Sequence, residues 1–128
     1  EEILVFEAAD NGRSWSSWQM VGKHLKTDED AMLAVQQELL LRTGYTCKNW
    51  VYLGAFVIDE TQKDGAGYYF CAKVAEKTLV SDEKHSQNLK LKWVAKQEIK
   101  QALLDGRVAV INHALAISLA ILMCNNND

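Results

Sequence analysis

Three positions on one predicted helix decide which chemistry this chain can perform. Glu38, Leu41 and Arg42 stand at i, i+3 and i+4, so their side chains converge on one part of the helix surface. Carboxylates at this spacing can share a magnesium ion, which prefers hard oxygen ligands in near-octahedral geometry. Here, however, only Glu38 is a carboxylate, and Arg42 is positioned to pair with it. The pattern therefore disfavours a magnesium site and favours an ion pair.

The segment around these positions has the features of a capped amphipathic helix. Thr27-x-x-Asp30 is a capping-box pattern, and the acidic residues at 28–30 suit the positive end of a helix dipole. Gly44 suits the left-handed residue that ends a helix. One face is predicted to carry residues at three- and four-residue spacing, namely Ala31, Ala34, Val35, Glu38, Leu39 and Arg42. Taken alone, such a helix with one ion pair is ordinary surface chemistry.

The stretch from Gly22 to Tyr45 resembles the Nudix box, G-x5-E-x7-R-E-U-x-E-E-x-G-U, where U is a bulky apolar residue. Gly22 falls on the first glycine of the glycine pair at the start of the box, and the box positions that the chain retains are Glu29, Glu38, Leu39, Gly44 and Tyr45. The chain departs from the pattern at four positions. Lys23 stands in place of a glycine, Gln37 in place of the arginine, and Leu41 and Arg42 in place of two glutamates. In the family these carboxylates hold magnesium. The resemblance therefore implies a Nudix fold whose metal site is degenerate.

The flanking segments extend this resemblance over nearly the whole chain. Trp18 to Gly22 is similar to the family's W-x-L-P-G-G segment, with Val21 in place of proline. The C-terminal part resembles ADP-ribose pyrophosphatase-type members through Leu91-x-Trp93-Val94, Glu98-Ile99, Ala102-Leu103 and Gly106-x-Val108. The implied fold class is α+β, an α/β/α sandwich in which helices flank a Nudix-like mixed β-sheet.

Hydrophobic patterns predict the elements without reference to the family. Runs rich in β-branched and aromatic residues predict strands at 2–7, 50–59, 68–74 and 89–94. Thr61 to Gly67 is expected to join the second and third of these as a hairpin-like loop. Helical segments are expected at roughly 96–104 and 112–123, with Asp105-Gly106 between them.

Length and charge limit the classes of function. A chain of 128 residues fits a single domain, which we place at residues 1–124, followed by a polar tail at 125–128. The resembling family usually has one more N-terminal strand, which this sequence does not show. A net charge of −3 gives no general attraction to nucleic acid.

Two further features concern location. The apolar stretch from Ala114 to Met123 is far shorter than the roughly 20 residues that cross a bilayer, so we expect no membrane span. The odd, scattered cysteines, Cys47, Cys71 and Cys124, are typical of a reducing compartment. We therefore expect a cytoplasmic protein.

The favoured functional hypothesis is a Nudix-fold protein with little or no hydrolysis, which binds a nucleotide-diphosphate-type ligand or a protein partner. The motive for this hypothesis is that Leu41 and Arg42 stand where the Nudix box has carboxylates. Arg42 or Lys23 would meet a phosphate directly. Aromatic residues would stack on a base, although such residues are more often core or solvated surface. The aromatic candidates are Trp18, Phe56, Trp50 and Tyr52.

The alternative is an active pyrophosphohydrolase acting on ADP-ribose-like nucleoside diphosphate derivatives. In that case Glu38 and Glu29 would hold magnesium or manganese, and the metal would activate water. A further acid would come from Asp82, Glu83 or Glu76. A third interpretation is a Nudix fold that serves a homodimer interface, which nothing in the sequence excludes.

Overall fold

The computed structural model describes residues 2–8, 17–26, 28–57, 60–61, 65–73, 76–77 and 89–124. Three helices and seven strands lie within these ranges, in the order β1 (Glu2–Ala8), β2 (Ser17–Gln19), α1 (Ala31–Thr43), β3 (Tyr45–Thr46), β4 (Asn49–Val57), β5 (Ala66–Lys73), β6 (Glu76–Lys77), β7 (Leu89–Ala95), α2 (Lys96–Asp105) and α3 (Ile111–Cys124). The predicted α+β class is confirmed. The four longer strands and all three helices lie where the sequence patterns predicted them.

The described strands hydrogen-bond as three antiparallel sheets, with orders β2-β1-β7, β3-β6 and β4-β5. Strand β1 is central in the first sheet and pairs with β7 along its whole length, from Glu2 opposite Ala95 to Ala8 opposite Leu89. Val5 and Phe6 are neighbours in this strand and therefore point to opposite faces, yet both are buried. The sheet is accordingly covered on both sides at its centre.

The main hydrophobic core joins the first sheet to α2 and α3. Burial of these apolar side chains is the principal stabilising contribution to this half of the molecule. The buried members are Val5, Trp18, Val94, Ile99, Ala102, Val108 and Ile117.

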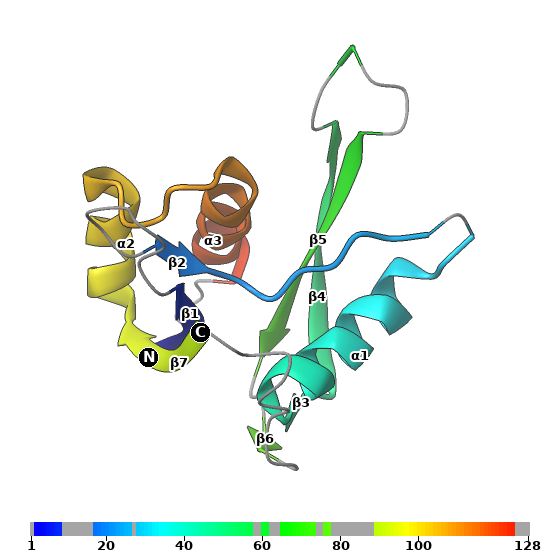
Figure 1. Cartoon of the computed structure of the whole chain (residues 1–128), viewed down its shortest axis with the longest axis horizontal. Helices are drawn as coiled ribbons and strands as arrows, with labels where there is room; N and C mark the ends of the chain where they lie inside the picture. Colours follow the sequence, from blue (N-terminus) through cyan, green and yellow to red (C-terminus); the bar gives the residue numbers. More distant parts are fainter. Residues whose placement is uncertain are drawn as a thin grey trace.

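The β4–β5 hairpin lies between α1 on one side and α3 on the other (Figure 1). This arrangement is the layered order expected of an α/β/α sandwich. A bulge interrupts the hairpin between Tyr52 and Gly54, where Gly54 adopts φ 130°, a left-handed value that side chains rarely tolerate. The ring of Phe56 occupies the space next to Gly54, since a Cβ there would lie 3.1 Å from that ring.

Helix α1 begins one turn later than its capping pattern suggested. Asp30 is the N-cap, and its carboxylate accepts the backbone N–H groups of Met32 (2.9 Å) and Leu33 (3.2 Å). Thr27, the cap expected from the sequence, lies outside the described residues. At the other end, Gly44 adopts φ 78° and donates its N–H to the Leu40 carbonyl (2.8 Å), so the predicted C-terminal stop is confirmed.

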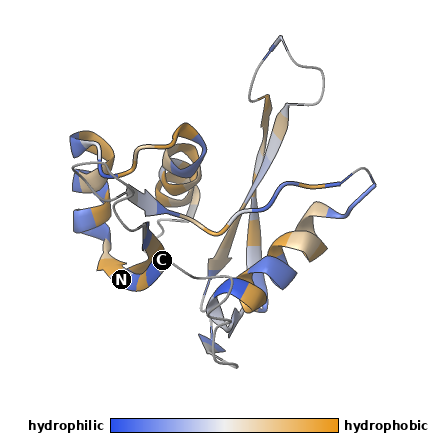
Figure 2. Ribbon diagram, viewed as in Figure 1, coloured by the Kyte–Doolittle hydropathy of each residue, from blue (hydrophilic) through white to orange (hydrophobic). Residues whose placement is uncertain are grey.

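Helix α3 is apolar along most of its length, as Figure 2 shows by its largely orange colour. None of the described helices is both long and apolar enough to span a membrane. One polar contact joins α3 to the segment after β2, because the backbone N–H of Met20 donates to Nδ1 of His113 (3.0 Å). This bond requires an unprotonated Nδ1.

The N-cap gives a first prediction. Asp30→Ala removes the acceptor for two backbone N–H groups and is expected to lower the free energy of unfolding by about 1 kcal/mol. Urea denaturation followed by circular dichroism measures this. Asp30→Ser, which keeps a side-chain acceptor, is the matched control and should lose much less. Equal midpoints for Asp30→Ala and the parent would show that Asp30 does not cap the helix.

His113 gives a second prediction. Burial lowers the pKa of His113 below its ordinary value of 6.5, so the unfolded chain binds a proton before the folded chain does. Its contribution to stability is therefore complete above pH 6.5 and is lost as the pH falls towards the lower folded pKa. His113→Asn keeps an acceptor for Met20 but cannot titrate. Between pH 7.5 and pH 5.5, the urea midpoint should fall further for the parent than for His113→Asn. An equal fall in the two proteins would contradict this assignment.

Candidate functional site

The centre of the candidate site is an ion pair on the side of α1 that faces β1. Arg42 Nη1 lies 3.4 Å from Glu38 Oε2, and the two side chains are only 21% and 17% exposed. Beneath them, the Arg42 guanidinium carbon lies 5.0 Å from the centroid of the buried Phe6 ring, a cation–π distance. Arg42 is thus held between a carboxylate of its own helix and an aromatic ring of β1.

A second ion pair lies in the segment that leads into α1. Lys23 Nζ is 2.7 Å from Glu29 Oε2, and the backbone N–H of Lys26 donates to the other oxygen of Glu29 (2.9 Å). The hydrogen bond from Lys23 is the main reason that the pKa of Glu29 lies below its usual value. The same bond raises the pKa of Lys23, and the negative charge of Glu38 also contributes. The two ion pairs are therefore electrostatic neighbours.

The structure thus brings together Lys23, Glu29, Glu38 and Arg42, four of the six site residues predicted from sequence. Their two positive and two negative charges sum to zero, so neither sign is left in excess. Lys23 stands where the Nudix box has a glycine, and it supplies the cation that neutralises the retained glutamate Glu29.

A magnesium ion does not fit this arrangement. The carboxylate of Glu38 is shared with a guanidinium, and Leu41, which is 41% exposed, offers no ligand atom. Among the described residues, no three histidine, cysteine, aspartate or glutamate side chains are grouped so as to hold a metal. Of the expected downstream acids, Asp82 and Glu83 lie outside the described residues, whereas Glu76 is exposed on β6, opposite Thr46 of β3.

The other two predicted site residues lie elsewhere. Trp18 is only 2% exposed, and the cationic groups of Lys92 and Arg107 lie 5.2 Å and 4.7 Å from its ring. The ring is part of the hydrophobic core, so this burial does not favour the predicted stacking of Trp18 on a base. Phe56 is 41% exposed on β4 and packs edge-to-face against Tyr69 at 5.9 Å between ring centroids.

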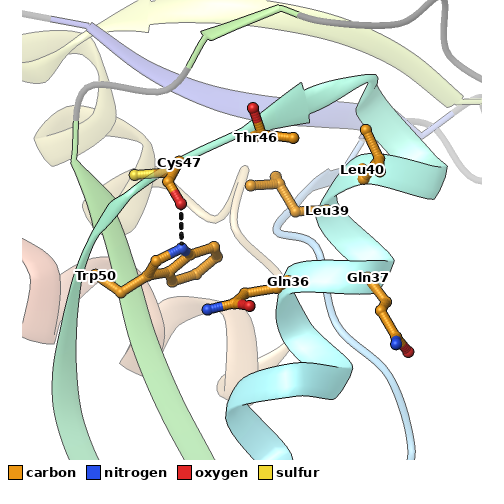
Figure 3. A pocket seen from close by; sticks show the side chains of 7 residues that line it. All are labelled: Gln36, Gln37, Leu39, Leu40, Thr46, Cys47 and Trp50. Atoms are coloured by element: carbon orange, nitrogen blue, oxygen red, sulfur yellow. Dashed lines mark hydrogen bonds between the residues drawn. The ribbon is translucent and has the colours of Figure 1, made fainter.

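A hollow of about 230 Å³ lies between α1 and the segment from Thr46 to Trp50 (Figure 3), and neither Glu38 nor Arg42 lines it. Trp50 forms one wall, and its indole N–H donates to the Cys47 carbonyl (2.8 Å), which fixes the ring. The lining of the hollow carries no charged side chain. It consists of Gln36, Gln37, Leu39, Leu40, Thr46, Cys47 and Trp50. Tyr52, also considered for stacking, is 51% exposed and packs against Phe70.

Sequence reasoning missed Phe6 as a member of the site. It lies 36 positions before Arg42 in an apolar strand, and no spacing rule connects the two. The partnership of Lys23 with Glu29 was also missed, although a signal was present, since a lysine replaces a box glycine six residues before a retained glutamate.

The Glu38–Arg42 contact predicts a measurable coupling. In a double-mutant cycle with Glu38→Gln and Arg42→Gln, we expect a coupling free energy of about 0.5–1 kcal/mol, because the pair is mostly buried but its contact is long. Urea denaturation of the four proteins provides the measurement. High salt should reduce the coupling less than for the more exposed Lys23–Glu29 pair, tested by the matching glutamine substitutions. Additive single substitutions would show that the pair does not form.

No protein-family model matches the sequence, and no curated protein matches it significantly. Solved structures do share the fold. An "ADP compounds hydrolase" aligns with a TM-score of 0.76 and 13% identity over 97% of this chain; the chain spans 66% of that protein, just under two thirds of its length. A MutT structure, from work on Aliivibrio salmonicida and Vibrio cholerae, has a TM-score of 0.64 and 14% identity. The alignment covers 95% of this chain and 87% of the MutT chain. A Nudix hydrolase from Nitrosomonas europaea has a TM-score of 0.62 and 15% identity, and the alignment covers 94% of this chain and 80% of that protein. The chain therefore has the Nudix fold, as the resemblance of its Gly22–Tyr45 segment predicted.

Proposed function

We propose that this protein binds a nucleoside diphosphate derivative of the ADP-ribose type at the Lys23–Arg42 face of α1, with little or no hydrolysis. The observation that carries the proposal is the Arg42–Glu38 ion pair, which occupies two of the three helix positions where the Nudix box has carboxylates. A guanidinium there replaces the metal as the source of positive charge.

The chemistry of Arg42 supports direct contact with a diphosphate. A planar guanidinium presents a fork of N–H donors that matches phosphate oxygens and is always charged. Glu38 engages Nη1, while the buried Nε has no hydrogen-bond partner among the described residues. The side chain also remains 21% exposed. Lys23, whose side chain is 33% exposed, adds a second cation in the segment that leads into α1.

The carboxylates limit the affinity of such a site. Glu29 and Glu38 already neutralise the two cations, so a diphosphate must compete with them. Binding is therefore expected to be moderate and sensitive to salt. We assign contact with the base to Phe56, since its side chain is 41% exposed whereas Trp18 is enclosed.

We also propose the cytoplasm as the location. The thiol of Cys47 supports this, because it donates to the Lys73 carbonyl (2.8 Å) and is not part of a disulfide.

Calorimetry with ADP-ribose tests the proposal. We expect binding in EDTA, and no gain in affinity when magnesium is added, because arginine rather than metal supplies the positive charge. Arg42→Gln should weaken binding about tenfold, the loss expected for one charged hydrogen bond. Lys92→Gln is the matched control, since Lys92 contacts Trp18 outside the site and should leave affinity unchanged.

Turnover assays test for hydrolysis, which would contradict the proposal. ADP-ribose, a dinucleoside polyphosphate and a nucleoside triphosphate would each be incubated with magnesium or manganese, and nucleoside monophosphate release measured. Release that Glu38→Gln abolishes would overturn the non-catalytic proposal. It would establish instead the alternative, a metal-dependent pyrophosphohydrolase.

A further inference from the structure

The solvent-facing side of α1 carries no charge. The three exposed residues of this helix are Leu33 (54%), Gln37 and Leu41 (41%), which form one row at i, i+4 and i+8. A surface helix normally presents charged and polar residues to water. In α1 the only charged residues are Glu38 and Arg42, and these pair with each other on a different side. We name the row Leu33, Gln37 and Leu41 the outer row.

The uncharged surface continues beyond the outer row into the hollow beside it. Gln37 belongs to both, and Figure 3 shows Gln36 and Leu39 from α1 facing the cavity that Trp50 closes. At about 230 Å³ the hollow is smaller than a usual small-molecule pocket of roughly 300–1,000 Å³. It has room for a side chain of a protein partner.

The outer row is complementary to itself. Leu33-x3-Gln37-x3-Leu41 has the same residue types in both directions, so an antiparallel copy presents the same surface. With a two-fold axis beside Gln37, Leu33 would lie opposite Leu41 of the second copy, and the reverse contact would follow by symmetry. An isologous interface requires this reciprocity. The two Gln37 carboxamides, each a donor and an acceptor, would pair across the axis.

An uncharged row also lowers the electrostatic cost of bringing two copies together. Each chain has a net charge of −3, so two copies repel wherever their charged surfaces meet. Contact through an uncharged row avoids that repulsion locally. Burying Leu33 and Leu41 together removes apolar surface from water, which stabilises the contact.

We propose that a second copy of this chain docks on the outer row of α1 and forms a two-fold symmetric, antiparallel dimer. In the most common class of helix–helix contact, ridges of side chains spaced four residues apart on the two helices interdigitate, and the outer row is such a ridge. The Glu38–Arg42 pair lies on another side of the helix and stays open in this dimer. The inference therefore does not depend on the ligand proposed above.

A helix of 13 residues is only about 20 Å long, so the contact lies at the small end of stable interfaces. We expect a concentration-dependent dimer in the micromolar range. Sedimentation equilibrium on the full chain without ligand should show a mass that rises from 14.4 kDa towards twice that value.

Charge substitutions test the antiparallel register. Leu33→Glu should produce a monomer, because it places a carboxylate opposite an apolar leucine at both ends of the contact. Leu33→Glu combined with Leu41→Lys should restore the dimer, since each new acid then faces a new base of the other copy. Leu33→Glu combined with Leu41→Glu should remain monomeric. Leu104→Glu is the matched control, because Leu104 is 82% exposed on α2 and lies outside the row.

A crosslink tests the position of the axis. Gln37→Cys places a thiol opposite itself and should give a covalent dimer on oxidation, in clear excess over the parent with its native cysteines. Circular dichroism checks that every variant is folded. A parent that stays monomeric at all concentrations would overturn the proposal and leave the outer row to a different protein. A dimer that Leu33→Glu does not weaken would overturn it equally, by placing the interface on another face.

Discussion

The contact on which the candidate site depends is the ion pair between Glu38 and Arg42 above the ring of Phe6. It ties α1 to β1, because the guanidinium touches both the carboxylate of its own helix and an aromatic side chain of the first sheet. It also sets the charge of the site. A carboxylate cluster needs a cation to offset mutual repulsion, whereas a carboxylate next to a guanidinium is already neutralised. Arg42 therefore determines both the packing and the charge of this helix face.

The fold and the site make different demands on the sequence. This chain shares its fold with solved structures at identities of only 13 to 15%, and in this chain the fold rests on a layered core and a helix ended by Gly44. Catalysis by a metal instead needs several oxygen ligands at fixed positions, which single substitutions remove. A shared fold thus carries little information about activity, and the function has to be argued from the side chains at the site.

Helix α1 separates two kinds of surface. Its inner side holds the charged residues in paired form, while the outer row consists of two leucines and a glutamine. Because these surfaces lie on different sides of one rigid helix, a ligand on one and a protein on the other need not compete. The neutral hollow beside Trp50 belongs with the outer surface, since no charged side chain lines it.

Local patterns in the sequence determined the helices, the four longer strands, the stop at Gly44 and the pairing of Glu38 with Arg42. Each of these rests on short-range spacing, such as the i, i+4 geometry of a helix or the period of two in a strand. The tertiary structure alone decided that Phe6 lies under Arg42, that Trp18 is enclosed by Lys92 and Arg107, and that the outer row borders a hollow. These contacts join residues far apart in the chain, and they depend on how layers pack rather than on any periodicity within one element. The helix cap is Asp30, which the sequence pattern did not single out, because several neighbouring residues are of types that can cap a helix.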